Sequence, residues 1–298
     1  MNTAISVILP NYNGRHLLEK NIPSLISALN GFHFEIIIVD DCSSDGSIKF
    51  LIETYPDIEI IQSSTNEGFS STCNKGINAA KYELLCIANT DVIFANDYFL
   101  YAIPHFEVPN IFAVAGNINN YASSIETLTN TDKTSLMYFS RGLLRFNQRV
   151  EPNPEIFTGQ INGQFILLGC CFLCNKDKLL QLGGFDEIFS PFYWEDADLA
   201  IRALRRGYKL VYEPKCNVFH KTSSTIGEHT KNYTRRLISN RNKLIFTWRH
   251  LTGLKNWLLH IFFSSFNIIT RWLILDWKYY VSLAMALGRT LKFFYTRK

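Results

Sequence analysis

The stretch YELLCIANTDV, residues 82–92, decides the fold of this chain. Its apolar run from Leu84 to Ala88 ends abruptly in the polar residues Asn89, Thr90 and Asp91. A short run that is apolar on both faces predicts a fully buried strand of a parallel sheet. Open α/β sheets bind their ligands at the carboxyl ends of such strands, where Asp91 stands. A strand followed by an ordinary polar turn is the alternative interpretation.

The residues before this stretch alternate between strands and helices. Strands are predicted at 4–9, 34–39 and 58–62, and helices at 16–29, 47–55 and 70–80. This alternation predicts a parallel sheet with right-handed crossovers. The second strand ends in Asp40 and Asp41, and the carboxyl ends of parallel strands meet at one edge. We therefore expect these acids to share a cleft with Asp91.

The usual phosphate-binding fingerprints of nucleotide folds are missing. Neither G-x-G-x-x-G nor G-x-x-x-x-G-K-[ST] occurs after the first strand. A nucleotide bound at this edge would therefore need a metal ion, or the amides of a helix end, for its phosphates.

The second half of the chain has a weaker pattern. Further strands are predicted at 111–115, 165–174, 209–212 and 216–219, with a short helix at 176–182. Residues 117–160 are hard to assign, and a long irregular stretch is often functional, here as an acceptor site or a lid. A helix is expected from Glu195 or Asp196 to Gly207. Acids in a first turn suit the helix dipole, so simple capping is the alternative to a catalytic role.

Length and cysteine content narrow the class of protein. The 298 residues suit one large α/β domain or two domains. Cys170, Cys171 and Cys174 have no second Cys or His pair at zinc spacing, which predicts a structural role. Residues 3–10 are too short for the apolar region of a secretory signal. We therefore expect a cytoplasmic chain with reduced thiols.

Five motifs, in order along residues 4–225, resemble glycosyltransferase family 2, the inverting GT-A enzymes, and within it the rhamnosyltransferase-like members. The motifs are SVILPNYNG, IIIVDDCSSDGS, NEGFSSTCNKGINAAKYELLCIANTDV, GGFDEIFSPFYWEDADLAIRALRRG and VFHKTSST. The resemblance implies a GT-A fold with a mostly parallel central sheet. It also implies a metal-dependent transfer of a hexosyl or rhamnosyl group from a UDP- or dTDP-sugar to a saccharide or lipid-linked acceptor, in cell-surface polysaccharide assembly.

The resemblance also assigns roles at the metal and at the reacting sugar. Asp91 matches the last acid of a D-x-D-like motif that holds a divalent cation, Mg²⁺ or Mn²⁺, and Asn89 stands where the first acid is usual. Asparagine offers an oxygen without a charge. His220 matches a histidine that completes the coordination in some members. Asp196 matches the catalytic base, with Glu195 before it, because inversion needs a carboxylate to take the acceptor proton.

Donor binding is assigned to residues from three of the motifs. Asp41 matches the acid that accepts a hydrogen bond from a pyrimidine ring N–H. The other expected nucleotide contacts are Pro10, Tyr12, Asn66, Gly68 and Asn74. Trp194 is expected either to pack against sugar or to belong to the core.

The C-terminal part of the chain has a different charge from the rest. Residues 229–298 carry 13 Lys or Arg and one acid, a net +12, whereas residues 1–228 carry a net −8. We therefore divide the chain into a GT-A domain, residues 1–228, and a basic helical tail, residues 229–298. The 15 uncharged residues 256–270 fall short of the about 20 that a spanning helix needs.

The tail is predicted to lie on the inner face of the cytoplasmic membrane. His260, Ser264, Asn267 and Arg271 recur at helical spacing as one polar stripe, which favours an interfacial amphipathic helix. The alternatives are a tail that folds back on the catalytic domain and a homodimer contact. No nucleic acid partner is expected, because the apolar content of the tail is too high.

Two other functions are compatible with parts of the sequence. The missing first acid at Asn89 would suit a catalytically weak sugar-nucleotide-binding or scaffold subunit of a glycan assembly complex. A processive polysaccharide synthase is disfavoured, because Q-x-x-R-W and multiple clean spanning helices are absent.

Overall fold

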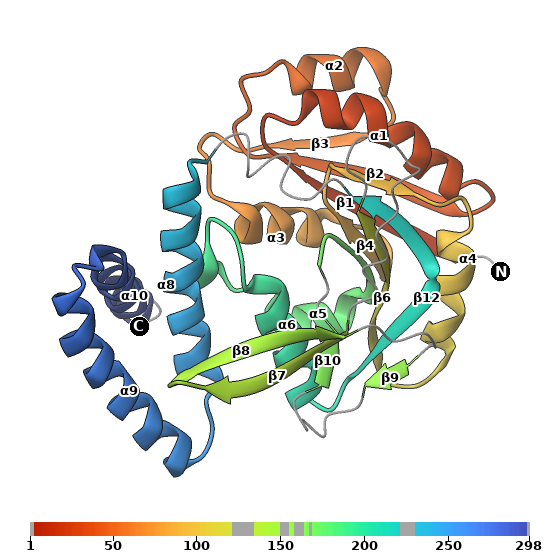
Figure 1. The fold of residues 1–298 in the computed structure, drawn as a ribbon. Helices are drawn as coiled ribbons and strands as arrows, with labels where there is room; N and C mark the ends of the chain where they lie inside the picture. The colour runs from red at the N-terminus through yellow and green to blue at the C-terminus, as the bar shows by residue number, and fades with distance from the viewer. Residues whose placement is uncertain are drawn as a thin grey trace.

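The computed structural model describes residues 3–120, 134–149, 155–157, 164–166, 169–220 and 230–296. Its first half alternates strands and helices as predicted (Figure 1). The elements are β1 (Ala4–Asn11), α1 (Arg15–Ala28), β2 (His33–Asp40), α2 (Ser47–Thr54), β3 (Glu59–Gln62), α3 (Phe69–Ala79) and β4 (Leu84–Ala88). Strand β4, from the stretch that begins the sequence argument, is buried at every residue.

The second half begins with a strand and helices that lead back into the sheet. These are β5 (Val92–Phe94), α4 (Tyr98–Ala102), the 3-10 helix η1 (Ile103–Glu107), β6 (Ile111–Asn120), β7 (Thr134–Ser140), β8 (Leu143–Arg149), β9 (Glu155–Phe157) and β10 (Gln164–Ile166). They are followed by β11 (Cys171–Asn175), α5 (Lys176–Gln181), the 3-10 helix η2 (Glu187–Phe189), α6 (Glu195–Arg205) and β12 (Lys209–His220). Three long helices complete the chain: α8 (Asn232–His250), α9 (Leu254–Leu273) and α10 (Trp277–Thr296).

The central sheet is mostly parallel, as expected. Its strand order is β3-β2-β1-β4-β11-β6-β12-β5, with β9 beside β12. Strands β3, β2, β1 and β4 pair in parallel, and β6 and β12 pair in parallel beyond an antiparallel β11. Strands β5 and β9 run antiparallel to β12. The carboxyl ends of β1, β2 and β4 therefore lie at one edge, as the α/β pattern predicts.

The core lies on both faces of this sheet. Along β1, Ile8 points into an apolar cluster with α3, α6 and α8, whereas its neighbours Val7 and Leu9 point into a cluster with α1 and α4. This alternation follows from the two-residue period of a strand. Each fully buried Leu, Ile or Phe stabilises the fold by about 1.5–3 kcal/mol, so both layers hold the sheet in place.

Two expectations about the second half need correction, and one segment that the sequence left unassigned is now partly described. The predicted strands at 209–212 and 216–219 form the single strand β12, which keeps its pairing with β6 through a register shift between Glu213 and Asn217. The predicted strand at 165–174 is divided into β10 and β11. The segment 117–160 contains the rest of β6, the β7–β8 hairpin and β9, and its other residues lie outside the described ranges.

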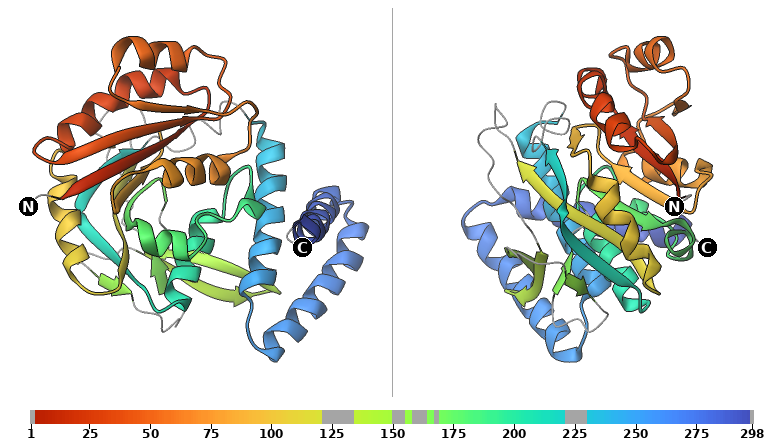
Figure 2. Two further views of the ribbon diagram at one scale, coloured as in Figure 1. Left: turned by 180° about the vertical axis from the view of Figure 1, so that it is seen from behind. Right: turned by 90° about the vertical axis from the view of Figure 1, so that its right-hand side faces the viewer.

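The three C-terminal helices differ in how they meet the rest of the protein. Leu244, Ile245 and Phe246 of α8 belong to the same buried cluster as α6, so this helix folds back on the sheet domain. Helices α9 and α10 lie beyond α8 at the outer edge of the molecule (Figures 1 and 2). Among the described residues, no helix is both long and apolar enough to cross a membrane. The division at residue 228 stays a prediction.

Candidate active site

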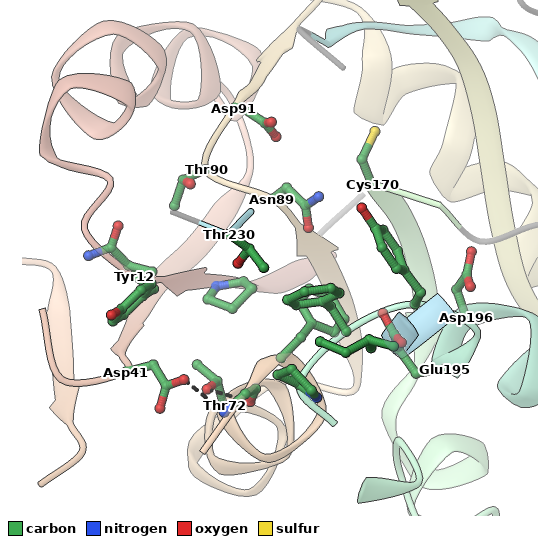
Figure 3. A pocket seen from close by; sticks show the side chains of 18 of the residues that line it. Tyr12, Asp41, Thr72, Asn89, Thr90, Asp91, Cys170, Glu195, Asp196 and Thr230 are labelled. Atoms are coloured by element: carbon green, nitrogen blue, oxygen red, sulfur yellow. Dashed lines mark hydrogen bonds between the residues drawn. The ribbon is translucent and has the colours of Figure 1, made fainter. Parts of the chain in front are cut away.

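A cavity of about 610 Å³ opens at the carboxyl ends of β1, β2 and β4. In Figure 3, Tyr12 and Asp41 lie at one end of it, and Glu195 and Asp196 lie at the other. The start of α3, the loop before α6, the end of β12 and the start of α8 complete its walls. The site residues assigned from sequence that line it are Pro10, Tyr12, Asp41, Asn66, Gly68, Asn89, Asp91, Glu195, Asp196 and His220.

The end of the cavity near β2 is organised by Asp41. Its two carboxylate oxygens accept hydrogen bonds from the backbone N–H groups of Glu67 and Gly68, at 2.8 and 2.9 Å. These amides belong to the loop that leads into α3, so Asp41 holds the start of that helix against the end of β2. These two loop amides are thus already bonded to a side chain.

Gly68 lies where two walls of the cavity meet. Its φ of +89° favours glycine, and a Cβ added there would stand 2.7 Å from the Cα of Pro191. The next residue, Phe69, donates its backbone N–H to the Pro191 carbonyl at 2.9 Å. The loop that leads into α3 and the loop that leads into α6 are therefore joined by a direct hydrogen bond.

Asn74 was expected to contact the nucleotide, but it is not among the residues that line the cavity. Its side-chain amide donates to the Phe185 carbonyl and accepts from the Phe185 N–H, each at 2.9 Å. This pair of hydrogen bonds fastens α3 to the GGFDE turn. Asn74 therefore supports the wall of the cavity from behind.

The loop after β4 brings Asp91 and His220 together. Strand β12 pairs with β5 so that His220 stands opposite Val92, the residue after Asp91. The His220 Nε2 lies 3.2 Å from the Asp91 Oδ1. On the other side of the loop, buried Asn21 of α1 donates to the Thr90 carbonyl at 2.7 Å. The strand pairing explains why residues 129 positions apart in sequence meet at one point.

One carboxylate and one imidazole form a partial ligand set for a divalent cation. Within the described residues, no group of three or more His, Cys, Asp or Glu side chains could hold a metal ion. Mg²⁺ usually takes one or two protein carboxylates and completes its shell with substrate phosphates and water, and imidazole also suits Mn²⁺. Asp91 and His220 fit such a site at the cavity wall, provided that a diphosphate supplies the remaining oxygens.

The opposite end of the cavity holds two adjacent carboxyl groups at the start of α6. Burial and the nearby charges of Asp196 and Asp198 raise the pKa of Glu195 to about 8. The buried Glu195 Oε2 has no hydrogen-bond partner in the described structure. Burial also raises the pKa of Asp196, against the opposing effect of backbone N–H groups of Ala197 and Gly169. Glu195 is therefore protonated at pH 7.

Asp198, the third acid of this turn, has a structural role. Its carboxylate is fully buried and contacts Arg202 Nε at 2.6 Å and His250 Nε2 at 2.8 Å. Burial alone would raise its pKa, but the hydrogen bond from His250 and the charges of Arg202 and Arg249 lower it. Asp198 therefore joins α6 to the end of α8, and capping is too simple a description of these acids.

Several cavity residues were not singled out from the sequence. Phe192 and Tyr193 precede Trp194 on the loop before α6, and Thr234 and Ile238 come from α8. Trp194 lines the cavity and packs against Phe146 and Phe246, so its expected place in the core is confirmed, and its contact with sugar stays a prediction. The spacing of Thr234 and Ile238 puts them on one helical face, but nothing in the sequence shows that this face meets the acids.

Buried cysteines surround the site without forming a metal cluster. Cys171 and Cys174 belong to the apolar clusters on the two faces of β11, and Cys170 lines the cavity. Seven free thiols are present, of which Cys42 alone is exposed. Burial raises the pKa of Cys174 and Cys171, so these thiols remain protonated and behave as small apolar side chains.

Comparison with solved structures shows which fold class the chain has, and comparison with a family model shows its sequence family. Solved structures of the same GT-A fold include GalNAc-T7 with UDP, GalNAc and Mn²⁺, with a TM-score of 0.62 and 13% identity over 82% of this chain and 47% of that one. Staphylococcus aureus TarS 1-349 in complex with UDP-GlcNAc gives a TM-score of 0.58 and 16% identity over 88% of this chain and 72% of that one. At these identities the likeness concerns the fold alone.

The sequence family is defined by residues 6–178, which match the profile of glycosyl transferase family 2. The chain belongs to this family. Among curated relatives, the poly-beta-1,6-N-acetyl-D-glucosamine synthase of Staphylococcus aureus strain COL is 26% identical over 228 residues. That match covers 75% of this chain and 51% of the relative, so the chain spans about half the length of the curated relatives it matches first.

Proposed function

We propose that this protein is an inverting glycosyltransferase that transfers a sugar from a nucleoside diphosphate sugar to a saccharide or lipid-linked acceptor, in cell-surface polysaccharide assembly. The observation that carries the proposal is the single cavity that Asp41, Asp91, His220 and Asp196 all line. Its volume of about 610 Å³ lies within the range of about 300–1,000 Å³ typical of small-molecule sites. The family and the named ligands of the structural neighbours, UDP with Mn²⁺ and UDP-GlcNAc, support this assignment.

In this proposal the nucleotide binds at the β1–β2 end of the cavity. Tyr12 and Pro10 line the base, and Asp41 accepts the N–H of a pyrimidine ring. Each Asp41 oxygen already accepts one backbone hydrogen bond and has a lone pair left to accept a second one, from the base. Uracil and thymine both offer that N–H, so the donor class is a UDP- or dTDP-sugar.

The diphosphate is placed beside Asp91 and His220, which would hold a divalent cation there. A bound Mg²⁺ or Mn²⁺ would stabilise the charge of the leaving diphosphate. Asp196 takes the proton of the acceptor hydroxyl as that oxygen attacks the anomeric carbon from the face opposite the diphosphate. One direct displacement inverts the configuration, and it requires the base and the leaving diphosphate to lie on opposite faces of the reacting sugar carbon.

The test is a panel of UDP- and dTDP-sugars, including hexosyl and rhamnosyl donors, incubated with Mn²⁺ or Mg²⁺ and a mixture of saccharide acceptors. We expect release of nucleoside diphosphate and growth of acceptor mass with one donor, and loss of both in EDTA. A protein that binds a donor with no release under any condition would instead be the scaffold subunit that Asn89 suggests.

A membrane surface is the proposed partner of helix α9. The polar stripe of this helix faces the protein: buried His260 accepts from Trp248 Nε1 at 3.0 Å and also contacts the Gly142 carbonyl. The apolar face is exposed, with Leu258, Ile261, Phe262, Phe266, Ile269, Trp272 and Leu273 each more than half accessible. A helix with its polar side inward and its apolar side outward needs an apolar environment to cover it.

The charge of the tail favours an anionic lipid surface as this environment. Residues 229–298 hold 13 basic residues and one acid, Asp276, which is paired with Arg271. A bilayer with anionic headgroups complements both the positive charge and the exposed apolar face. A peripheral position there would place the cavity near lipid-linked acceptors.

A further inference from the structure

The loop that precedes the two cavity acids is held by side chains from the C-terminal helices. In η2 and the residues after it, from Glu187 to Tyr193, the carbonyls of six residues accept hydrogen bonds from α8 or α10. The acceptors are Glu187, Ile188, Phe189, Ser190, Phe192 and Tyr193. Side chains distant in sequence therefore fix the main chain that leads into α6.

Asn242 of α8 makes the largest share of these contacts. Its side-chain NH₂ donates to the carbonyls of Phe189, Phe192 and Tyr193 at 2.6, 3.0 and 2.9 Å. Two N–H groups serve three acceptors, so at least one hydrogen bond is shared. The side chain is fully buried, so the loss of its hydrogen bonds would leave buried polar groups unsatisfied.

Arg241 orients this amide. Its Nε donates to the Asn242 Oδ1 at 2.8 Å, which turns the NH₂ of Asn242 toward the loop, and its Nη2 donates to the Ser190 carbonyl. Arg241 is 6% exposed, and in the described part of the chain its partners are Asn242 and main-chain carbonyls. Within the described residues, the role of the Arg241 guanidinium is therefore to donate N–H groups to Asn242 and to the loop carbonyls.

The held segment is strained where the acids begin. Tyr193 and Trp194 have φ values of 76° and 79°, in the left-handed region that bulky side chains avoid. A bulky residue keeps such a conformation only when the surrounding structure determines it. Trp194 is followed at once by Glu195 and Asp196, so these two backbone angles set the direction in which the carboxyl groups enter the cavity.

We propose that Asn242, oriented by Arg241, is a positioning residue for transfer: it holds the backbone of Tyr193 and Trp194 in the left-handed conformation that aims Asp196 at the acceptor. The inference rests on the proposed function for its kinetic consequence, but not for its structural one. It makes α8, the first helix of the basic tail, a supporting part of the active site.

The test compares Asn242→Ala with Asn240→Ala, an exposed asparagine two residues earlier on the same helix. Misplacement of a reacting group by about 1 Å can cost about 10²-fold in rate, so we expect kcat of Asn242→Ala to fall by about that factor. The KM for the donor should change little, because Asp41 and Asp91 are carried by other loops. Asn240→Ala should behave as the wild type.

A second variant separates positioning from loss of the fold. Arg241→Lys keeps the charge but lacks the Nε–H that orients Asn242, so it should lower kcat in the same sense and by less. Hydrogen exchange measured by mass spectrometry should show faster exchange in the peptide spanning 187–196 of Asn242→Ala, with the peptide spanning 36–47 unchanged.

The proposal fails if exchange in 187–196 is the same in Asn242→Ala and the wild type. It also fails if kcat is unaffected, or if donor affinity and kcat collapse together with exchange rising across the whole chain. A wild-type protein that turns over no donor would refute the proposed function instead, and the exchange comparison would still decide the role of Asn242.

Discussion

At the scale of single residues, the adjacent acids Glu195 and Asp196 both have a pKa raised by burial, but their hydrogen-bonding surroundings differ. Glu195 is buried with one unpartnered oxygen, whereas backbone N–H groups support the charge of Asp196. Neighbouring carboxyl groups that differ in solvation titrate in separate steps. Glu195 is therefore the protonated carboxyl of the pair at pH 7, and Asp196, whose charge is supported by backbone N–H groups, is the proposed base.

This division predicts different effects of the two amide substitutions. Asp196→Asn should lower transfer by about 10²–10⁴-fold, the usual share of a general base, and leave donor binding intact in calorimetry. Glu195→Gln mimics the neutral form, so it should retain a larger share of transfer at pH 7. Transfer by the wild type should decline as pH falls through the raised pKa of Asp196. Equal loss in both variants would contradict the assigned base.

The pH dependence of the stability of the protein should reflect the raised pKa of Glu195. The pKa of Glu195 rises from its ordinary 4.5 to about 8 on folding, so the unfolded chain loses this proton first as pH rises. The residue therefore destabilises the fold increasingly between these two values. The melting temperature of Glu195→Gln, relative to that of the wild type, should increase from pH 5 to pH 9. A constant difference across that range would show that Glu195 is solvated.

In the proposed site, Asp91 is the acid on which metal binding would depend, because Asn89 brings no charge. Asp91→Ala should abolish the Mn²⁺-dependent part of donor binding and leave the metal-independent part, which comes from Asp41 and the base contacts. Calorimetric titration of nucleoside diphosphate with and without Mn²⁺ measures both parts. Asn89→Asp is the matched variant and should strengthen Mn²⁺ dependence, since it adds a carboxylate beside Asp91. An Asp91→Ala titration identical to that of the wild type would refute the metal role.

At the scale of elements, the sequence predicted the strands and helices that a local pattern of apolar and polar residues determines. The run 84–88 was recognisable as a buried strand because both of its faces are apolar, and the acids at its end followed from the parallel arrangement. The sequence could not show that His220 reaches Asp91, because that contact depends on a register between β12 and β5. It was assigned by resemblance, and the pairing supplies its physical reason.

The helices of the tail show the same limit. The stripe from His260 to Arg271 followed from helical spacing, but periodicity says only that one face is polar and not which way it points. The partners that turn it inward, Trp248 and Gly142, are 12 and 118 residues away from His260. Asn74 likewise carried a family role, whereas its contact with Phe185, 111 residues away, fixes its actual place.

At the scale of the whole molecule, charge and exposed apolar surface both belong to the C-terminal end. The acidic part, residues 1–228, supplies most of the cavity wall, and the basic part, residues 229–298, completes that wall with α8 and presents α9 at the outer edge (Figure 1). Attraction to anionic lipid would therefore orient the molecule with α9 at the surface. Each Lys or Arg near such a surface contributes about 1 kcal/mol, and salt screens this attraction.

The last prediction concerns this orientation. The wild type should sediment with vesicles that contain anionic lipid, less with neutral vesicles, and less again at 1 M salt. The variant Phe262→Asp with Ile269→Asp removes two side chains that are 61% and 68% exposed. Burial of each is worth about 1.5–3 kcal/mol, so vesicle affinity should fall by at least about tenfold.

The matched control is Ile52→Asp on α2, where the side chain is 60% exposed but lies on the sheet domain far from α9 in both views (Figures 1 and 2). It should bind vesicles as the wild type does. If instead the wild type is a dimer in light scattering and the α9 variant is a monomer with unchanged lipid binding, the exposed face is a contact between copies of the chain. A membrane surface and a second copy would cover the same apolar side chains. The membrane proposal therefore requires that the α9 variant loses lipid binding while its molecular mass stays that of the wild type.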